Sequence, residues 1–371
     1  MKRRKQLLIF GAALATLIAL AGLLDWALSQ PAVQHRLAAA EVARVTAKLA
    51  RQRALIDEPT LRVLLCGTSS PLANAERAGP CAAVIVAGDI WLIDVGGGAW
   101  KNLMLWQIPG ERVRGVLLTH FHSDHIQELG EVNLQSWASG RRAPLEVFGG
   151  PGVADVADGF AAAYALDRGY RIAHHGAETM SPATYPMLTK TVAAPDGRPL
   201  AEGETALVFE RGGLKVTAIG VPHEPVSPAY AYRFDYRGRS VVISGDTRFS
   251  PALAQAARGA DAILHEAQAQ DLVAILERDM RAAGNDRLAH IFADIPSYHA
   301  SPAEAAEVAN AAGAKLLVLT HLTPPLPHWL GERVFLAQAR TARPTGTVLA
   351  KDGMLISLPP ESAVVDIGSV R

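Results

Sequence analysis

The sequence predicts an α/β fold for most of the chain. Beyond Pro59, short runs rich in β-branched and aromatic residues are separated by Gly and Pro, and helical stretches alternate with them late in the chain. These runs are LRVLLCG, AAVIVAGDIWLIDVGGG, RVRGVLLTHFH, LEVFGGPG, LKVTAIGVPH, AYAYRFDYRGRSVVISGD and DAILHEA. Four predicted strands end in residues that can bind a metal, namely His120, His223, Asp246 and His321. Because α/β folds commonly collect reactive side chains at one rim of a sheet, these ends predict one functional site.

Length and composition are those of a large globular domain with an appendage. The chain has 371 residues, and 49% of them are hydrophobic, which is enough to bury a sizeable core. Basic and acidic side chains number 36 each, so the formal net charge is zero. A basic face is the usual mark of a nucleic-acid-binding protein, and the overall charge does not predict one, although a local patch stays open.

Residues 1–30 form the predicted appendage. Four basic residues at positions 2–5 precede an uncharged stretch, Leu7–Leu24, which as a helix would span roughly 27 Å, close to a bilayer core. The basic flank favours a cytoplasmic N-terminus, so we expect the remainder on the periplasmic side of the inner membrane. An uncleaved membrane anchor is favoured over a cleaved signal peptide, because the pairs Ala19/Ala21 and Ala27/Ser29 follow no clear polar boundary. A buried core helix is the remaining alternative.

Residues 31–58 form a predicted helical spacer before the domain at residues 59–371. The segment from Val33 to about Ile56 is rich in Ala, Arg, Glu and Leu and lacks Gly and Pro, which favours a helix. Later, the stretch Gly176–Gly203 contains several Pro, Gly and Thr residues. We expect it to form a loop or flap over one edge of the domain.

Two cysteines, Cys66 and Cys81, are present. In an oxidising compartment they could pair, and closing such a short loop would stabilise the fold by roughly 3 kcal/mol in the chain-entropy model. Two buried thiols are the alternative, and the sequence leaves both open. Neither cysteine has a neighbouring motif that indicates zinc binding or a nucleophile.

Four side chains of the types that bind metals fall within six positions of the segment THFHSDH. His120 and His122 alternate across one residue, while Asp124 and His125 follow where the chain turns. Imidazole nitrogen suits zinc and its neighbours, and a carboxylate suits a harder or shared position, so the mixture favours Zn, Mn or Fe over Ca or Mg. A chance cluster of surface histidines is the alternative, which this density disfavours.

The pattern resembles the first metal-binding motif of the metallo-β-lactamase superfamily, and the resemblance extends from about Leu61 to about Pro324. The LIDVGGG turn with Asp94, the later single histidine, the SGDT segment and the final LTH follow in the family's order. The resemblance implies an αββα sandwich with two divalent metal ions, chiefly Zn, with Mn or Fe as alternatives. It implies that Asp94 orients a ligand. The implied ligands are His120, His122 and His223 for one ion, Asp124, His125 and His321 for the other, and Asp246 for both.

Two later segments are similar to ribonuclease Z within this superfamily. Glu266 lies in ILHEAQAQ, and His299 precedes a Ser-Pro pair. The resemblance implies that His299 protonates the leaving oxygen while Glu266 orients the imidazole, with Asp124 the further catalytic residue. Ser301 also has the character of a helix N-cap, so the same stretch can simply begin a helix; the two interpretations are compatible.

Other segments are more similar to exported arylsulfatase and phosphodiesterase relatives of the same branch. These are LLCGTSSPLANAERAGPCAAVIV and FAAAYALDRGYRIAHH. The sequence also lacks a long arm rich in Gly and Lys, with which ribonuclease Z clamps tRNA. Since precursor tRNA is absent from a periplasm, tRNA is not the expected substrate.

The sequence therefore predicts a metal-dependent phosphodiesterase acting on a small-molecule ester or a nucleotide. Asp246 argues against antibiotic hydrolysis, because the zinc β-lactamases commonly carry a cysteine at the corresponding point. An arylsulfatase-like sulfate-ester hydrolase is the nearest alternative, followed by a lactonase and an inactive membrane-tethered metal-binding scaffold. The inner membrane is the expected partner of the N-terminal segment, and a homodimer is left open.

Overall fold

A computed structural model describes residues 2–370 of the chain; the side chains at positions 2–5, 7–9, 11, 12 and 328 are outside the described set. The chain divides into two compact units, Met1–Gln52 and Arg53–Arg371. Helix α1 (Lys2–Ser29) is followed by α2 (Pro31–Asp57), which confirms the predicted helix from Val33 to Ile56.

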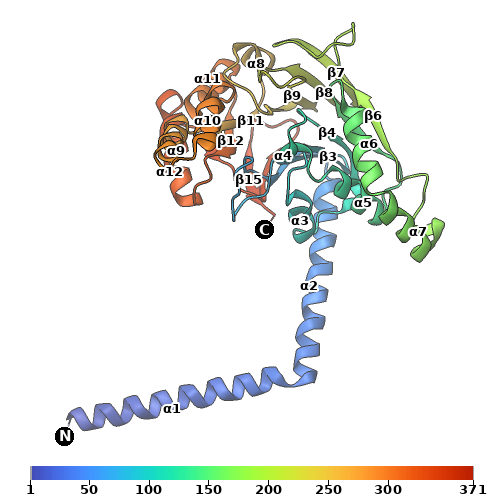
Figure 1. The fold of residues 1–371 in the computed structure, drawn as a ribbon. Coiled ribbons are helices and arrows are strands. Elements are labelled where there is room, and N and C mark those ends of the chain that lie inside the picture. Colours follow the sequence, from blue (N-terminus) through green and yellow to red (C-terminus); the bar gives the residue numbers. More distant parts are fainter. Residues whose placement is uncertain (1, 371) are drawn as a thin grey trace. The chain divides into compact units, whose positions relative to one another are not determined.

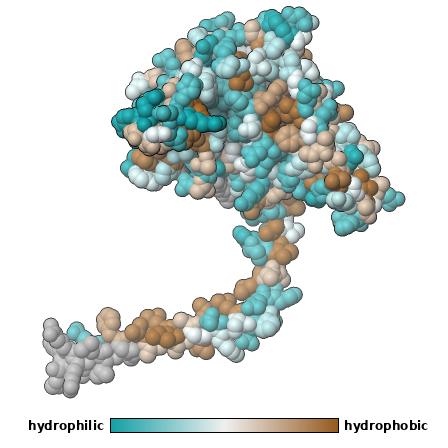
Figure 2. Space-filling model, in the orientation of Figure 1, coloured by the Kyte–Doolittle hydropathy of each residue, from teal (hydrophilic) through white to brown (hydrophobic). Residues whose placement is uncertain are grey.

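The N-terminal unit exposes large apolar side chains on α1. Leu17, Leu23 and Trp26 are each more than 60% exposed. Figure 2 shows hydrophobic residues, in brown, recurring along the N-terminal helical part of the chain. None of the helices searched among the described residues is by itself long and apolar enough to cross a bilayer. Residues 13–29 of α1 meet that criterion only together with α2, at a bend of 75°. The anchor or signal helix thus stays a prediction, and its basic flank lies outside the described side chains.

Two mixed β-sheets form the centre of the second unit (Figure 1). The eight-stranded sheet has the order β15-β14-β1-β2-β3-β4-β5-β6, and the seven-stranded sheet has the order β13-β12-β11-β10-β9-β8-β7. The strands of the first are β1 (Leu61–Gly67), β2 (Cys81–Val86), β3 (Asp89–Ile93), β4 (Val113–Leu117), β5 (Leu145–Gly149), β6 (Met187–Thr191), β14 (Met354–Leu358) and β15 (Asp366–Ser369). Those of the second are β7 (Thr205–Arg211), β8 (Leu214–Gly220), β9 (Tyr230–Tyr236), β10 (Arg239–Ile243), β11 (Ala262–Gln268), β12 (Leu316–Thr323) and β13 (Thr347–Leu349).

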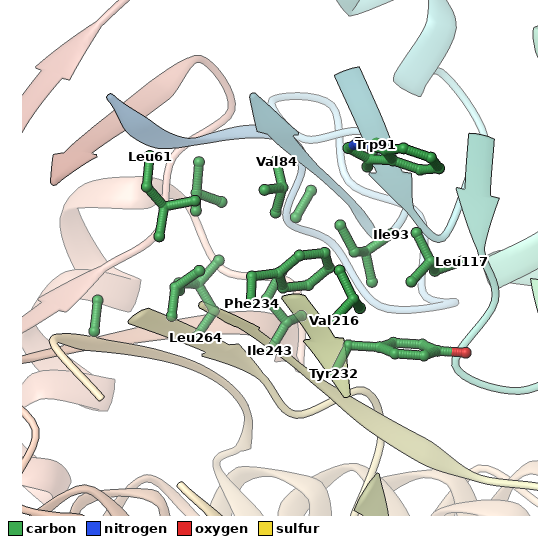
Figure 3. Packing of buried hydrophobic residues seen from close by; sticks show 14 of the residues in the cluster. Leu61, Val84, Trp91, Ile93, Leu117, Val216, Tyr232, Phe234, Ile243 and Leu264 are labelled. Carbon is green, nitrogen blue, oxygen red and sulfur yellow. The ribbon is translucent and has the colours of Figure 1, made fainter. Parts of the chain in front are cut away.

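The principal core lies between the two sheets. Alternate residues of a strand point to opposite faces, so Leu61 and Val63 of β1 join the cluster between the sheets while Leu64 packs outward. Figure 3 shows Ile93 and Leu117 of the first sheet facing Val216 and Tyr232 of the second. Because both faces of these strands are buried, they form continuous apolar runs in the sequence.

Helices cover the outer face of each sheet, which gives four layers and confirms the predicted αββα sandwich. On the first sheet, Leu64 and Leu92 belong to a cluster with Trp100 of α3 and Val132 of α5. On the second, the strands pack against helices near the C-terminus, as Leu317 does with a cluster that includes Phe335. The helices of this unit are α3 (Ala99–Leu105), α4 (Ser123–Ile126), α5 (Leu129–Ala138), α6 (Val153–Ala163), α7 (Ala165–Thr179), α8 (Pro251–Ala256), α9 (Gln270–Ala282), α10 (Asp286–Asp294), α11 (Pro302–Ala312) and α12 (His328–Ala342).

The segment Gly176–Gly203 is not wholly the loop that its composition predicts. It contains β6, which pairs in parallel with β5 at the edge of the first sheet. The sequence of this strand, MLTKT, is half-buried or exposed throughout, so it lacks the apolar alternation by which a strand is recognised. Pairing with an existing sheet edge, rather than its own pattern, makes it a strand.

A buried ion pair at the amino ends of β10 and β11, opposite the strand ends that carry the predicted ligands, binds the C-terminal tail to the second sheet. Arg239 Nε donates to Asp261 Oδ2 at 2.9 Å, and Lys315 Nζ donates to Oδ1 at 2.8 Å. Arg239 also donates to the carbonyl oxygens of Pro359 and Val364. Burial acts to raise the pKa of Asp261, but these hydrogen bonds and one from Ser240 N outweigh it and hold the pKa below its usual value.

Candidate metal centre

Strand ends bring the predicted ligands to one place. His120 follows β4, His223 follows β8, Asp246 follows β10, and His321 lies near the end of β12. Strands β10, β11 and β12 are mutually parallel, so their carboxyl ends share an edge, which is where open α/β sheets usually bind ligands. His321 has a φ of +49° and occupies a break in the β11–β12 register. This extra residue turns its side chain out of the regular strand alternation.

Metal-binding atoms converge in three overlapping groups, each with its atoms within 4.8 Å of one another. The first group is His120, His122, His223 and Asp246; the second is Asp124, His125 and His321; the third is Asp246, His299 and His321. The first two groups contain the residues that the resemblance assigns to each ion, with the shared Asp246 falling in the first of them. Apart from His122, which is exposed, and Asp124, which is half-buried, their members are buried.

One oxygen of Asp246 lies between the first two groups. Its Oδ2 is 3.4 Å from Nε2 of His125 and 3.4 Å from Nε2 of His321. The same oxygen is 3.8 Å from His120 Nε2 and 4.0 Å from His223 Nε2. A carboxylate in this position is within reach of ions held by either group.

The donor set fits divalent transition metals. Asp124 Oδ2 and His223 Nε2 are buried without a hydrogen-bond partner, as is the second oxygen of Asp246. Buried polar atoms without partners are costly, and coordination of a cation would satisfy them. Imidazoles with carboxylates are ligands that zinc, manganese and iron accept.

Burial favours the neutral form, which coordination requires, at two of the ligand histidines, His120 and His223. It lowers the pKa of His223 to about 4, and it lowers the pKa of His120 well below the usual value. A lone pair is therefore available on each ring at neutral pH.

Hydrogen bonds to neighbouring groups orient the ligands. Asp94 Oδ2 lies 2.7 Å from His125 Nδ1, as the resemblance implied, and accepts from Thr119 Oγ1 at 2.8 Å. His223 Nδ1 lies 2.9 Å from the carbonyl oxygen of Tyr298. Contacts of this kind fix the ring and its tautomer, leaving Nε2 to face the centre.

Comparison with known proteins shows the family. Residues 92–322 match the family described as Beta-lactamase superfamily domain. A ribonuclease Z of Mycobacterium sp. (strain KMS) is 34% identical over 310 residues, which are 83% of this chain and 100% of that protein. The ribonuclease Z of Mycobacterium marinum is 34% identical over 269 residues, 72% of this chain and 88% of that protein. The chain belongs to the ribonuclease Z family of the metallo-β-lactamase superfamily.

Solved structures share the fold of this ribonuclease Z family member. Human tRNase Z, short form, is 21% identical with a TM-score of 0.56, and the match covers 80% of this chain and 99% of that chain. The metallo-beta-lactamase fold protein YhfI from Bacillus subtilis is 20% identical, also with a TM-score of 0.56 and the same coverage. At this level of identity the likeness concerns the fold alone.

Glu266 and His299 are in direct contact beside the ligands. His299 Nδ1 lies 2.8 Å from Glu266 Oε1, and the same oxygen accepts from Thr247 N at 2.8 Å. Burial, with the charge of Asp246 nearby, raises the pKa of Glu266 well above its usual range, and burial lowers the pKa of His299. Ser301 caps α11 through a hydrogen bond from Glu304 N at 3.2 Å, so the predicted N-cap is confirmed alongside this contact.

The structure thus brings all the predicted site residues of this ribonuclease Z family member to one edge of the sandwich. Sequence reasoning missed Thr119 and Thr247, which position Asp94 and Glu266 respectively. Each directly follows or precedes a predicted ligand, and that adjacency is the signal that could have identified them. The loop 67–80 was also missed, because its contacts with the site come from its backbone.

Proposed function

We propose that this chain hydrolyses phosphodiester bonds at a centre of two divalent metal ions, chiefly zinc. The observation that carries the proposal is the position of Asp246 Oδ2, 3.4 to 4.0 Å from histidines of both groups. A single ion would need only one group. The relatives named ribonuclease Z support the phosphodiester as the class of substrate.

The ligands would divide between the two ions according to the first two groups of metal-binding residues described above. His120, His122 and His223 would hold one ion and Asp124, His125 and His321 the other, with Asp246 shared. Two ions held by these residues would supply a hydroxide at neutral pH and would stabilise charge on the attacking and leaving oxygens.

His299 would donate the proton that the leaving oxygen needs. Its Nδ1 is engaged by Glu266, so Nε2 is the ring atom left to carry the proton. Glu266 is 1% exposed and held by Thr247 N, which makes it a positioning residue for the imidazole. The hydrogen bond fixes the tautomer and the direction of Nε2.

The proposed substrate is a small phosphodiester or a nucleotide rather than tRNA. The formal net charge of zero supports this, because tRNA binding relies on a basic surface. The sulfate-ester and lactone alternatives stay predictions and serve as comparison substrates.

We further propose that the domain lies outside the cytoplasm, held by the N-terminal helix. The exposed apolar side chains of α1 support membrane association. A disulfide between Cys66 and Cys81 supports an oxidising compartment.

The test compares metal content with activity on three substrates. Purified full-length protein should contain close to two transition-metal ions per chain and hydrolyse bis(p-nitrophenyl) phosphate faster than p-nitrophenyl sulfate or a homoserine lactone. Chelation should remove the ions and the activity together. Full activity in metal-free protein would refute the metal-dependent mechanism, and a faster rate on the sulfate would reassign the substrate class.

A further inference from the structure

A disulfide closes the loop that borders one half of the metal centre. Cys66 in β1 is bonded to Cys81 at the start of β2, with a Cα–Cα distance of 5.0 Å. Both side chains are buried, at 0% and 4% exposure. The bond joins the two ends of the loop 67–80. It therefore restricts how far the backbone at either end of this loop can move.

One arm of the loop contacts the segment that carries Asp124 and His125. Gly96 N donates to Pro80 O at 2.9 Å, and Gly79 N donates to Gly97 O at 2.8 Å. Val95, the residue before Gly96, donates from its N to His125 O at 2.8 Å. Two hydrogen-bonded steps therefore connect the residue before Cys81 to the backbone of a ligand.

The absence of a side chain at Gly96 allows the backbones of Gly79 and Asp124 to approach it closely. A Cβ on Gly96 would lie 2.4 Å from the carbonyl carbon of Gly79 and 2.5 Å from the carbonyl oxygen of Asp124. No side chain can be inserted between these three backbone segments. Because these backbones are in close contact, a displacement of the Gly79 backbone would also displace the backbone of Asp124; no flexible side chain lies between them to accommodate the change.

The other arm contacts the strand that carries His321. Leu322 N donates to Thr68 O at 3.3 Å, and Ser69 pairs with Leu322 in a parallel bridge. His321, the preceding residue, has a left-handed φ of +49°, which costs energy for a residue with a side chain. Support from both neighbours is needed to keep this conformation, and the loop 67–80 provides part of it.

The disulfide also borders the space behind the ligands. Cys81 lines a cavity of about 40 Å³ together with His125, Asp246 and His321. Outside the second group, the ligands are held by other parts of the chain: His120 Nδ1 lies 3.0 Å from Thr119 Oγ1, and His223 Nδ1 lies 2.9 Å from Tyr298 O. Thr119 and Asp246 contact both halves of the centre, but the backbone contacts of the loop 67–80 described above reach only the half of Asp124, His125 and His321.

We propose that the Cys66–Cys81 disulfide is a positioning element for the half-site of Asp124, His125 and His321. The proposal rests on the two-ion centre proposed above. With the bond intact, both halves bind an ion; with the two thiols, the Asp124–His125–His321 half binds its ion more weakly, while the half of His120, His122 and His223 keeps its affinity.

The consequence is that the enzyme binds both metal ions tightly only after Cys66 and Cys81 have been oxidised to the disulfide. In forming the bond, the thiols of Cys66 and Cys81 lose two protons and two electrons to an external protein disulfide, which is reduced to two thiols by thiol–disulfide exchange. A chain kept in a reducing cytoplasm would then hold one tight ion and one weak one. Full metal loading would follow export to a compartment that supplies disulfides.

The test measures Zn²⁺ binding to each half-site, with a chromophoric chelator as competitor, in oxidised full-length protein and in the variant Cys66→Ala/Cys81→Ala. We expect the affinity for one of the two ions to fall by about 10–100-fold, the usual effect of removing a support of metal ligands. The affinity for the other ion should be unchanged. Asp261→Asn, at the opposite edge of the sheet, is the matched control: it should lower the unfolding temperature and leave both affinities intact.

Each result decides the proposal. Unchanged binding of two ions by the Cys variant, or an equal loss at both sites, would overturn it while leaving the proposed function in place. Fewer than two ions in oxidised wild-type protein would overturn the two-ion function as well. If the Cys variant does not fold, wild-type protein reduced with tris(carboxyethyl)phosphine takes its place; unfolding on reduction would show that the bond supports the whole fold, not one half-site.

Discussion

The contact between His299 and Glu266 allows a sharp test of the proton donor. His299 is 9% exposed, and its Nδ1 is 2.8 Å from a glutamate oxygen that Thr247 N also holds. A ring fixed in this way can present Nε2 to a leaving oxygen without reorienting. His299→Ala should therefore remove the donor and leave the neighbouring backbone in place.

The size of the effect depends on the leaving group. General acid catalysis contributes about 10²–10⁴ in rate, or roughly 3–5 kcal/mol of the barrier at 1.36 kcal/mol per factor of ten. An alkoxide needs a proton to depart, so alkyl phosphodiesters should show this full loss. The p-nitrophenolate ion departs unprotonated, so bis(p-nitrophenyl) phosphate should be affected far less.

The assay compares kcat/KM on both kinds of ester for wild type, His299→Ala and Glu266→Gln, with the metal content of each protein. The Glu266 variant should show the same pattern more weakly, because it changes only the orientation and basicity of the ring. Equal losses on both esters would refute the proton-donor role. Because His299 also groups with Asp246 and His321 within 4.8 Å, a loss of metal in His299→Ala would instead identify it as a ligand.

Three further predictions concern the shared ligand, the location and the ion pair at the far edge. Asp246→Ala should lower metal content, measured by mass spectrometry, more than His122→Ala does; an equal or smaller loss would mean that Asp246 does not serve both ions. A reporter that is active only after export should give signal when fused behind Ala50, and signal only from a cytoplasm-active reporter would contradict the predicted topology. Asp261→Asn should lower the free energy of unfolding at pH 7 by about 3 kcal/mol, since it leaves Arg239 buried without its counter-charge. Because the pKa of Asp261 is lowered in the fold, the contribution is complete above its unfolded pKa of about 4 and is lost as pH falls through the folded pKa. Denaturant unfolding of both proteins should therefore converge in acid, and a constant difference would contradict this reasoning.

Local sequence determined most of the ligand set. THFHSDH places four metal-binding side chains within six positions, and no long-range contact is needed to see that they cluster. The apolar runs ahead of His120, Asp246 and His321 predicted buried strands with these residues at their ends. The strands of the structure coincide with these apolar runs. The reason is that a strand buried on both faces must be apolar along its whole length.

Some outcomes depend on neighbours that the sequence does not show. β6 has no apolar pattern of its own, and it forms because the edge of β5 offers hydrogen bonds. Cys66 and Cys81 could have been two thiols; the pairing of β1 with β2 brings them together. In both cases the deciding partner is another strand.

The sequence by itself determined that this chain has an α/β domain with a cluster of metal-binding residues, because strand periodicity and ligand spacing are local properties. The tertiary structure decided how those residues meet. Only the folded sheets place Glu266 against His299, 33 positions away, and set Asp246 between two groups of ligands that come from three other strand ends. The physical reason is that side-chain distances across a sheet depend on strand order and register, and these are set by long-range packing that no short segment encodes.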